Sequence, residues 1–184
     1  TKVISSVCGL VVEAIKAGRQ ITPAAEWLLD NLQLINDQIE TTRCHLPKGY
    51  SRGLPRLVNG SSPSLPRVYN IALEVISRTD ARLDADVLLH FVAAYQKITS
   101  LQLGELWAFP IMLRLALIEN LRRVAGRLAL SLTQRNLADY WADQMSETAE
   151  SSPTDLIVVI ADMARSIPPM ESAFVAELVR RLQG

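Results

Sequence analysis

Two acidic residues, Asp84 and Asp86, have a type and spacing that could support metal chemistry. Carboxylates two residues apart can hold one hard divalent cation when they lie on a loop or at a strand end. These two instead precede an apolar run at 87–89, which fits the cap and first turn of a helix, where acids accept backbone amides and favour the positive end of the dipole. With no second acidic cluster or strand nearby, we predict a helix cap.

Other potentially reactive groups are isolated along the sequence. Glu105, Asp139 and Asp143 could supply the paired carboxylates of glycoside chemistry, but single acids on helices are usually solvated or ion-paired. The Cys-His pair at 44–45 lacks the further ligands of a zinc site, and His90 lies among apolar helix positions as a structural histidine would. No Walker loop, nucleophile elbow or dinucleotide motif occurs. We therefore assign no catalytic residue, metal ligand or cofactor to this chain.

A basic stretch is the clearest charge feature. Residues 41–73 contain no acid but five basic side chains: Arg43, Lys48, Arg52, Arg56 and Arg67. One interpretation is a surface that docks a partner domain or an anionic ligand through bidentate arginine contacts. The interpretation we favour is structural, with the arginines bonding loop carbonyls and pairing with Asp30 and Asp37. If the docking role holds, a neighbouring domain is the expected partner.

Helical periodicity dominates the elements that would position these groups. We predict helices over residues 4–16, 22–41, 103–132, 135–148 and 152–166, others starting at 66 and 84, and a last one after 168–169. Pro110 either kinks or restarts the helix in which it lies. Residues 46–65 combine three prolines, three glycines and several apolar side chains, so we expect an ordered loop across the helices.

The totals indicate a globular, all-α protein: a multi-helix bundle or irregular helical array with one long Pro/Gly-rich basic loop, as a single domain over residues 1–184. Apolar residues make up 49% of the chain, and 19 basic residues balance 19 acidic ones, so no nucleic-acid or anionic-membrane partner is expected. The apolar run 106–118 is too short for a membrane span and contains Arg114. Two cysteines, Cys8 and Cys44, fit a reducing compartment, and the sequence leaves open whether a disulfide joins them.

Several motifs together carry a resemblance. They are PAAEWLLDN at 23–31, LPKGY at 46–50, LP at 54–55, PRVY at 66–69, FVAAYQ at 91–96 and GELWAFPIMLRLALIENLRR at 104–123. In order and spacing they resemble the amino-terminal part of bacterial cyclic β-1,2-glucan synthases. The similarity is dense over 22–127 and thinner through 140–143 and 174–184.

The resemblance implies a very large inner-membrane parent enzyme. Such proteins combine a glucosyltransferase that uses UDP-glucose, membrane helices and a phosphorylase-like carboxy-terminal part. The chain would be the helical region before the transferase, on the cytoplasmic face of the bacterial inner membrane. The catalytic residues of the family lie outside the matched positions, so we expect the parent, and not this chain alone, to be the enzyme.

Two functions follow as hypotheses. The first is a non-catalytic scaffold or docking domain that meets other domains of the same enzyme, through a surface containing Glu26, Trp27, Asp30, Asn31, Arg52, Arg56, Arg67, Tyr69, Glu105, Trp107 and Arg114. The second is a carbohydrate-binding module that holds the growing β-glucan. In that case Trp27, Tyr50, Tyr69 and Trp107 would stack on glucose rings, while Asp30, Asn31 and Glu105 accept hydroxyl hydrogen bonds. Because the tryptophans fall at helical spacing, we predict that they are core anchors.

Overall fold

The computed structural model describes residues 2–46, 49–57, 64–166 and 170–183. Over these ranges the chain is helical, and its β pairing is limited to one bridge between Arg56 and Pro66, so the all-α prediction is confirmed. The elements are α1 (Lys2–Lys16), α2 (Pro23–Asp30), α3 (Leu32–His45), the 3₁₀ turn η1 (Tyr50–Arg52), α4 (Arg67–Arg78), α5 (Ala85–Gln96), α6 (Leu103–Ser151), the 3₁₀ turn η2 (Pro153–Asp155), α7 (Leu156–Ser166) and α8 (Ser172–Gln183).

Local signals account for several helix ends. α1 stops at Gly18, which adopts a φ of 69°, and the Arg19 amide then donates to the carbonyl of Ala14 at 3.0 Å. At the start of α5, Oδ1 of Asp84 accepts the amides of Asp86 and Val87 at 3.0 and 3.1 Å. The predicted helix cap at Asp84 is therefore confirmed.

The predicted helix over residues 22–41 is wrong in two respects. It is interrupted at Asn31, whose backbone has φ −98° and ψ 9°, and it resumes as α3 and continues to His45. The Asn31 side-chain amide donates to the carbonyl of Trp27 at 2.8 Å, an acceptor that would otherwise serve the helix ladder alone. A polar side chain that competes with the backbone therefore sits at the break.

The predicted boundary between residues 132 and 135 is also wrong, because α6 is one continuous helix of 49 residues. Between Leu132 and Arg135 there is no glycine or proline to stop it. Pro110 lies inside the helix on an exposed face rather than starting a new one. Continuity therefore follows from the absence of a breaker.

Contacts group the chain into two compact units. Unit 1 comprises Trp27–Val124 with Thr1–Val3, and unit 2 comprises Ile4–Glu26 with Ala125–Gly184. α6 thus contributes its first part to unit 1 and its second part to unit 2. That both units form the single domain predicted over residues 1–184 stays a prediction.

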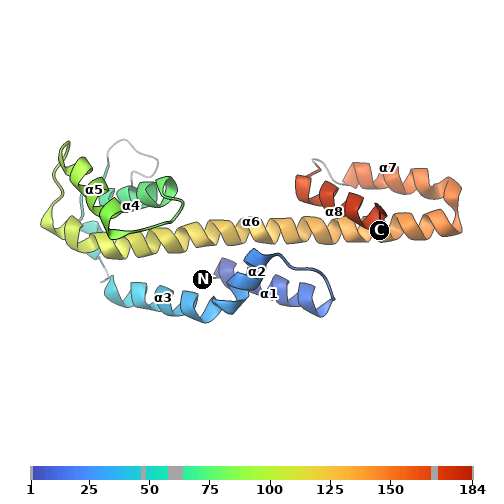
Figure 1. Ribbon diagram of the computed structural model, residues 1–184, viewed down its shortest axis with the longest axis horizontal. Coiled ribbons are helices and arrows are strands. Elements are labelled where there is room, and N and C mark those ends of the chain that lie inside the picture. Colours follow the sequence, from blue (N-terminus) through green and yellow to red (C-terminus); the bar gives the residue numbers. More distant parts are fainter. Residues whose placement is uncertain (1, 47–48, 58–63, 167–169, 184) are drawn as a thin grey trace. The chain divides into compact units, whose positions relative to one another are not determined.

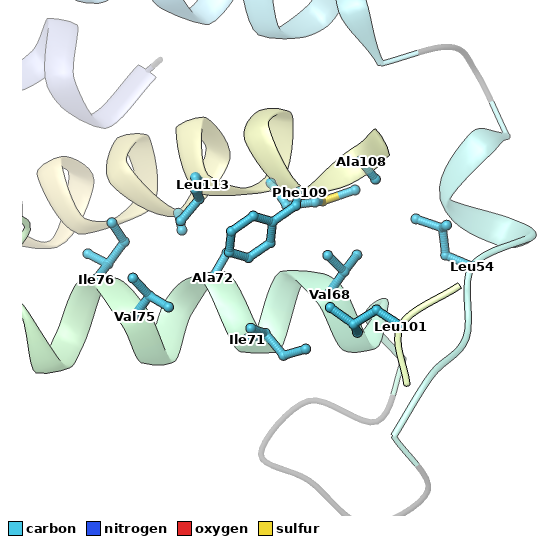
Figure 2. Packing of buried hydrophobic residues seen from close by; sticks show 12 residues of the cluster. Leu54, Val68, Ile71, Ala72, Val75, Ile76, Leu101, Ala108, Phe109 and Leu113 are labelled. Atoms are coloured by element: carbon cyan, nitrogen blue, oxygen red, sulfur yellow. The ribbon is translucent and has the colours of Figure 1, made fainter. Parts of the chain in front are cut away.

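The core of unit 1 forms where α4 lies along the first part of α6 (Figure 1). Figure 2 shows Phe109 of α6 directed at α4 beside Ala72, with Val68 and Val75 on either side. The buried members of the unit 1 core are Leu54, Val68, Ile71, Ala72, Val75, Ile76, Leu101, Ala108, Phe109, Met112, Leu113 and Ala116. From α5, the side chains of Leu88, Phe91, Val92 and Tyr95 pack against this core, whereas Val87 is exposed.

The core of unit 2 forms where α7 and α8 run beside the last part of α6 (Figure 1). Ala138, Met145, Met163 and Phe174 are buried there, and Trp141 packs against them half-buried. Phe174, the first aromatic residue of α8, is fully enclosed, so it anchors the last helix.

Candidate functional site

Among the residues that the structure describes, the most enclosed charge is the carboxylate of Glu105, in the first turn of α6. Its side chain is 0% exposed and is paired with Arg67, at the start of α4, which is 13% exposed. Nε of Arg67 donates to Oε1 of Glu105 at 2.9 Å and Nη2 donates to Oε2 at 2.5 Å. The pair is therefore bidentate, the arrangement in which arginine binds a carboxylate most strongly.

The segments around this pair are tied to it by backbone groups. Oε2 of Glu105 accepts the amide of Gln102 at 2.9 Å, which closes the first turn of α6 in the manner of a capping box. Nη2 of Arg67 also donates to the carbonyl of Ser100 at 3.2 Å, and the Arg67 amide donates to Pro55 at 2.7 Å. The buried ion pair thus joins the starts of α4 and α6, and Arg67 also binds the carbonyls of Pro55, before α4, and of Ser100, before α6.

The described part of the predicted loop, residues 49–57, contacts the start of α6 and the unit 1 core. The Tyr50 hydroxyl donates to the carbonyl of Gly104 at 2.9 Å, and Leu54 is buried in the unit 1 core. Residues 47–48 and 58–63 of that loop lie outside the described residues. Residues 49–57 thus make contacts with the start of α6 and with the unit 1 core, while the ordered loop expected over residues 46–65 stays a prediction.

The electrostatics of the pair favour the ionised form of Glu105. Burial acts to raise the pKa of this carboxyl, but the hydrogen bonds from Arg67 and the Gln102 amide outweigh it, so the pKa lies below its usual value. The same hydrogen bond raises the pKa of Arg67. A carboxylate held in this way accepts hydrogen bonds that join the starts of two helices.

The three acids considered for glycoside chemistry each pair with an arginine of their own compact unit. Glu105 is enclosed in unit 1, whereas Asp139 and Asp143 both pair with Arg181 in unit 2. His90, which the sequence analysis interpreted as a structural histidine among apolar helix positions, is exposed, and its Nδ1 lies 2.7 Å from the carbonyl oxygen of Asp86 in the same helix. These groups are used locally.

The two tryptophans of the predicted surface are not core anchors. Trp27 is 53% exposed and Trp107 is 77% exposed, so the core prediction is wrong for both. Neighbouring Phe109 takes the core position instead, at 8% exposed. Glu26 and Asp30 are exposed as well. Asn31 is half-buried, and its side-chain amide donates a hydrogen bond to the Trp27 carbonyl.

Arg114 lines a shallow apolar groove in unit 1. The groove lies between α3 and α6 and has a volume of about 310 Å³. It is lined by Leu34, Ile35, Gln38, Pro110, Leu113, Arg114, Leu117, Ile118 and Leu121. Tyr69, on α4, is half-buried, and burial raises the pKa of its hydroxyl, with Glu119 adding to the effect. Among the predicted surface residues, Arg114 thus lines a groove, whereas Tyr69 is only partly accessible.

The predicted pairing of the loop arginines with Asp30 and Asp37 is wrong. Arg67 pairs with Glu105 and Arg43 with Glu40, while Asp37 accepts the side-chain amide of Gln33 at 2.9 Å. Arg52 and Arg56 are exposed, and their side chains form no hydrogen bond or ion pair within the described ranges. These two arginines remain open to solvent on the ordered part of the loop.

The structure also bears on the cysteines, on metal binding and on membrane-spanning helices. Cys8 is buried and Cys44 exposed, both as free thiols, and burial raises the pKa of Cys8. Among the described residues, no three His, Cys, Asp or Glu side chains gather closely enough to hold a metal ion. In the same ranges, no helix is both long enough and apolar enough to span a membrane.

Comparison with known proteins adds the decisive observation. No protein-family model matches the chain. Over 169 residues, 92% of the chain, it is 33% identical to the cyclic beta-(1,2)-glucan synthase NdvB of Rhizobium meliloti (strain 1021). The chain is related to the cyclic β-(1,2)-glucan synthase family. It spans only 6% of the length of that relative, so this synthase is a far larger protein.

The pairing of Arg67 with Glu105 is what sequence reasoning missed at this site. Both residues were assigned to the predicted surface, but as separate members of it. They are 38 positions apart, and opposite charge was the only signal in the sequence. The bidentate contact joins the motifs at 66–69 and 104–123, two of those that carry the resemblance to glucan synthases.

Proposed function

We propose that the chain is a non-catalytic docking module of a larger glucan synthase, to which other domains of the same polypeptide bind. The observation that carries this is the first turns of α6, where Leu103 is 70% exposed and Trp107 is 77% exposed. Large apolar groups that are exposed on a rigid support are typical anchors of protein interfaces.

The support beneath these side chains is stiff. Glu105 lies between Leu103 and Trp107 in the chain and points inward to Arg67, while the Gly104 carbonyl accepts the Tyr50 hydroxyl. A side chain presented from such a turn loses little entropy on binding, because its backbone is already ordered. This favours docking over a mobile linker role.

The parent, in this proposal, transfers glucose from UDP-glucose to make cyclic β-1,2-glucan, with the chain on the cytoplasmic face of the bacterial inner membrane. The relationship to NdvB supports the parent activity, since that protein is named as a cyclic β-(1,2)-glucan synthase. The ionised, enclosed state of Glu105 supports a structural contribution of this chain to that activity rather than a proton-transfer role.

A second candidate function is a carbohydrate-binding module. It is favoured by the exposure of Trp27 and Trp107, because an exposed aromatic face can pack against the C–H face of a sugar ring. Asp30 is exposed and available as an acceptor, whereas Glu105 is enclosed and does not reach a ligand on this surface.

A photo-crosslinking amino acid at position 107 of the full-length parent separates the two functions. Docking predicts crosslinks from position 107 to a domain outside the chain, and few from the matched position 150, which is also exposed on α6. Trp107→Ala should then lower glucosyl transfer from UDP-glucose while leaving the thermal unfolding of the isolated chain unchanged.

Two results would decide against docking. One is the absence of crosslinks from position 107 to any other domain. The other is saturable binding of a β-1,2-linked glucan oligosaccharide to the isolated chain that is abolished by Trp27→Ala or Trp107→Ala. The second result would establish the carbohydrate-binding function at this surface.

A further inference from the structure

One face of α6 runs from the exposed Trp107 into the apolar groove between α3 and α6. Its members alternate four and three residues apart, a spacing that places side chains on one side of a helix. They form the α6 stripe: Leu103, Trp107, Pro110, Arg114, Leu117, Leu121 and Val124. All of them lie in unit 1, and the four members from Pro110 to Leu121 line the groove. The surface proposed for docking and the groove therefore form one continuous face.

The groove itself is almost entirely apolar. Apart from Gln38 and Arg114, every residue that lines it is apolar. Ile35 and Leu113 are its least exposed members, at 6% and 8%, whereas Leu34 on α3 is 55% exposed. Covering such a surface removes apolar area from water and is favourable by about 25 cal/mol per Å². A contiguous apolar face on a rigid pair of helices is typical of a binding groove.

Arg114 is the feature that selects the occupant. It is half-buried among the apolar lining residues, and its side chain forms no hydrogen bond or ion pair with any part of the chain that the structure describes. By contrast, Arg122 and Arg123 of the same helix both pair with Glu119. An apolar partner alone would bury the Arg114 guanidinium without compensation, which is costly, whereas a carboxylate would pair with it.

The backbone of the groove indicates the fold of the occupant. The walls are helices, whose central amides and carbonyls bond within α3 and α6, so the groove offers side chains and no strand edge. An extended segment pressed against it would leave its own backbone groups without partners, whereas a helix satisfies them internally. Positions 110 to 121 extend over about 17 Å of α6, so about three turns of a helix would cover the groove.

A second copy of the chain is a poor fit for this face. Arg114 is the middle member of the α6 stripe, with three members on either side. Two stripes paired around a two-fold axis, whether parallel in register or antiparallel about their centre, would bring Arg114 against Arg114. Like charges opposed in a closed interface cost several kcal/mol. The charge pattern therefore favours a different segment, one that carries an acid.

We infer that an amphipathic helix from another domain of the parent occupies this groove, with apolar side chains against α3 and α6 and a carboxylate paired with Arg114. The inference rests on the proposed docking function and adds to it the kind of segment that docks. Trp107 and Leu103 extend the same contact beyond the end of the groove.

A photo-crosslinking amino acid at position 34 of the full-length parent identifies the occupant. Leu34 is exposed on the α3 side of the groove, so its replacement should leave the fold intact. Mass spectrometry should place the crosslinks in one helical segment outside the chain, with apolar residues three and four apart and an aspartate or glutamate among them.

A synthetic peptide of that segment then tests the charge pair in solution. Fluorescence anisotropy of the labelled peptide gives its affinity for the chain. Arg114→Glu should weaken binding at least about tenfold, whereas Arg114→Lys, which keeps the charge, should retain most of it. Replacing the acid of the peptide by lysine should restore binding to Arg114→Glu. Arg127→Glu is the matched control, since Arg127 is exposed on α6 outside the groove and its reversal should leave the affinity unchanged.

Circular dichroism would verify that each variant folds. The inference is overturned if position 34 crosslinks only to a second copy of the chain or to no segment outside it. It is equally overturned if Arg114→Glu binds the peptide as tightly as the natural chain does. Crosslinks from position 107 without any from position 34 would leave docking intact and remove the groove helix alone, whereas silence at both positions would remove both proposals.

Discussion

Removal of the Arg67 guanidinium should destabilise unit 1 strongly. Arg67→Met retains most of the aliphatic stem but leaves the carboxylate of Glu105, which is 0% exposed, without its partner. Breaking a buried pair from one side costs about 3–5 kcal/mol, because the remaining charge is uncompensated. That is a large share of the about 5–15 kcal/mol that stabilises a typical domain.

Arg78→Met is the matched control in the same helix. Arg78 pairs with Glu74 through side chains that are 70% and 53% exposed, so its removal should cost less than about 1 kcal/mol. Urea unfolding, followed by circular dichroism, measures how much unfolding free energy each variant loses. Hydrogen exchange of α4 and the first turn of α6 assigns that loss to unit 1, because the two compact units need not unfold together.

The contribution of Glu105 to stability depends on pH with opposite signs in the natural chain and in Arg67→Met. In the natural chain the pKa of Glu105 lies below its ordinary 4.5, so its stabilisation is present above pH 4.5 and is lost as pH falls through the lower folded pKa. In Arg67→Met, burial without the guanidinium raises the pKa of Glu105, so acidification relieves the penalty. The stability gap between the two should therefore narrow between neutral pH and pH 4.5.

The double change Arg67→Met with Glu105→Leu removes both charges. Replacing a buried ion pair by apolar groups is often neutral, so the double variant should recover most of the loss. The reasoning is refuted if Arg67→Met costs no more than Arg78→Met, or if the gap does not change with pH.

Three further predictions concern packing, capping and thiol reactivity. Phe109→Ala should cost about 3–5 kcal/mol in chemical unfolding, because its ring fills the core between α4 and α6, whereas Trp107→Ala should change stability by less than about 0.5 kcal/mol. Asp84→Ala should cost about 1 kcal/mol through loss of two amide hydrogen bonds, measured in the same way, whereas Asp84→Asn should be nearly neutral. In the folded chain iodoacetamide should label Cys44 well before Cys8, as read by mass spectrometry; equal rates would contradict the burial of Cys8.

Local chemistry was sufficient to predict several helix ends from the sequence. Asp84 binds amides two and three residues ahead, and Gly18 takes the left-handed conformation that ends α1. The turn at Pro153 likewise starts the segment that leads into α7. Such interactions join residues within one turn, so their partners are known once the sequence is known.

The choice of buried face in α6 could not be predicted in the same way. Between residues 106 and 118 nearly every side chain is apolar, so helical periodicity does not distinguish the inner face from the outer one. The position of α4 decides which face is buried. Phe109 is directed at α4 and is buried (Figure 2), whereas Trp107 is 77% exposed.

The sequence alone determined the helical class, most helix boundaries, the motifs shared with cyclic β-1,2-glucan synthases and the charge type of each site residue. Only the tertiary structure paired Arg67 with Glu105 across 38 positions and brought α3 to α6 around one groove. Caps and turns depend on neighbours a few bonds away, whereas burial and ion pairing depend on distances that the packing of separate helices sets.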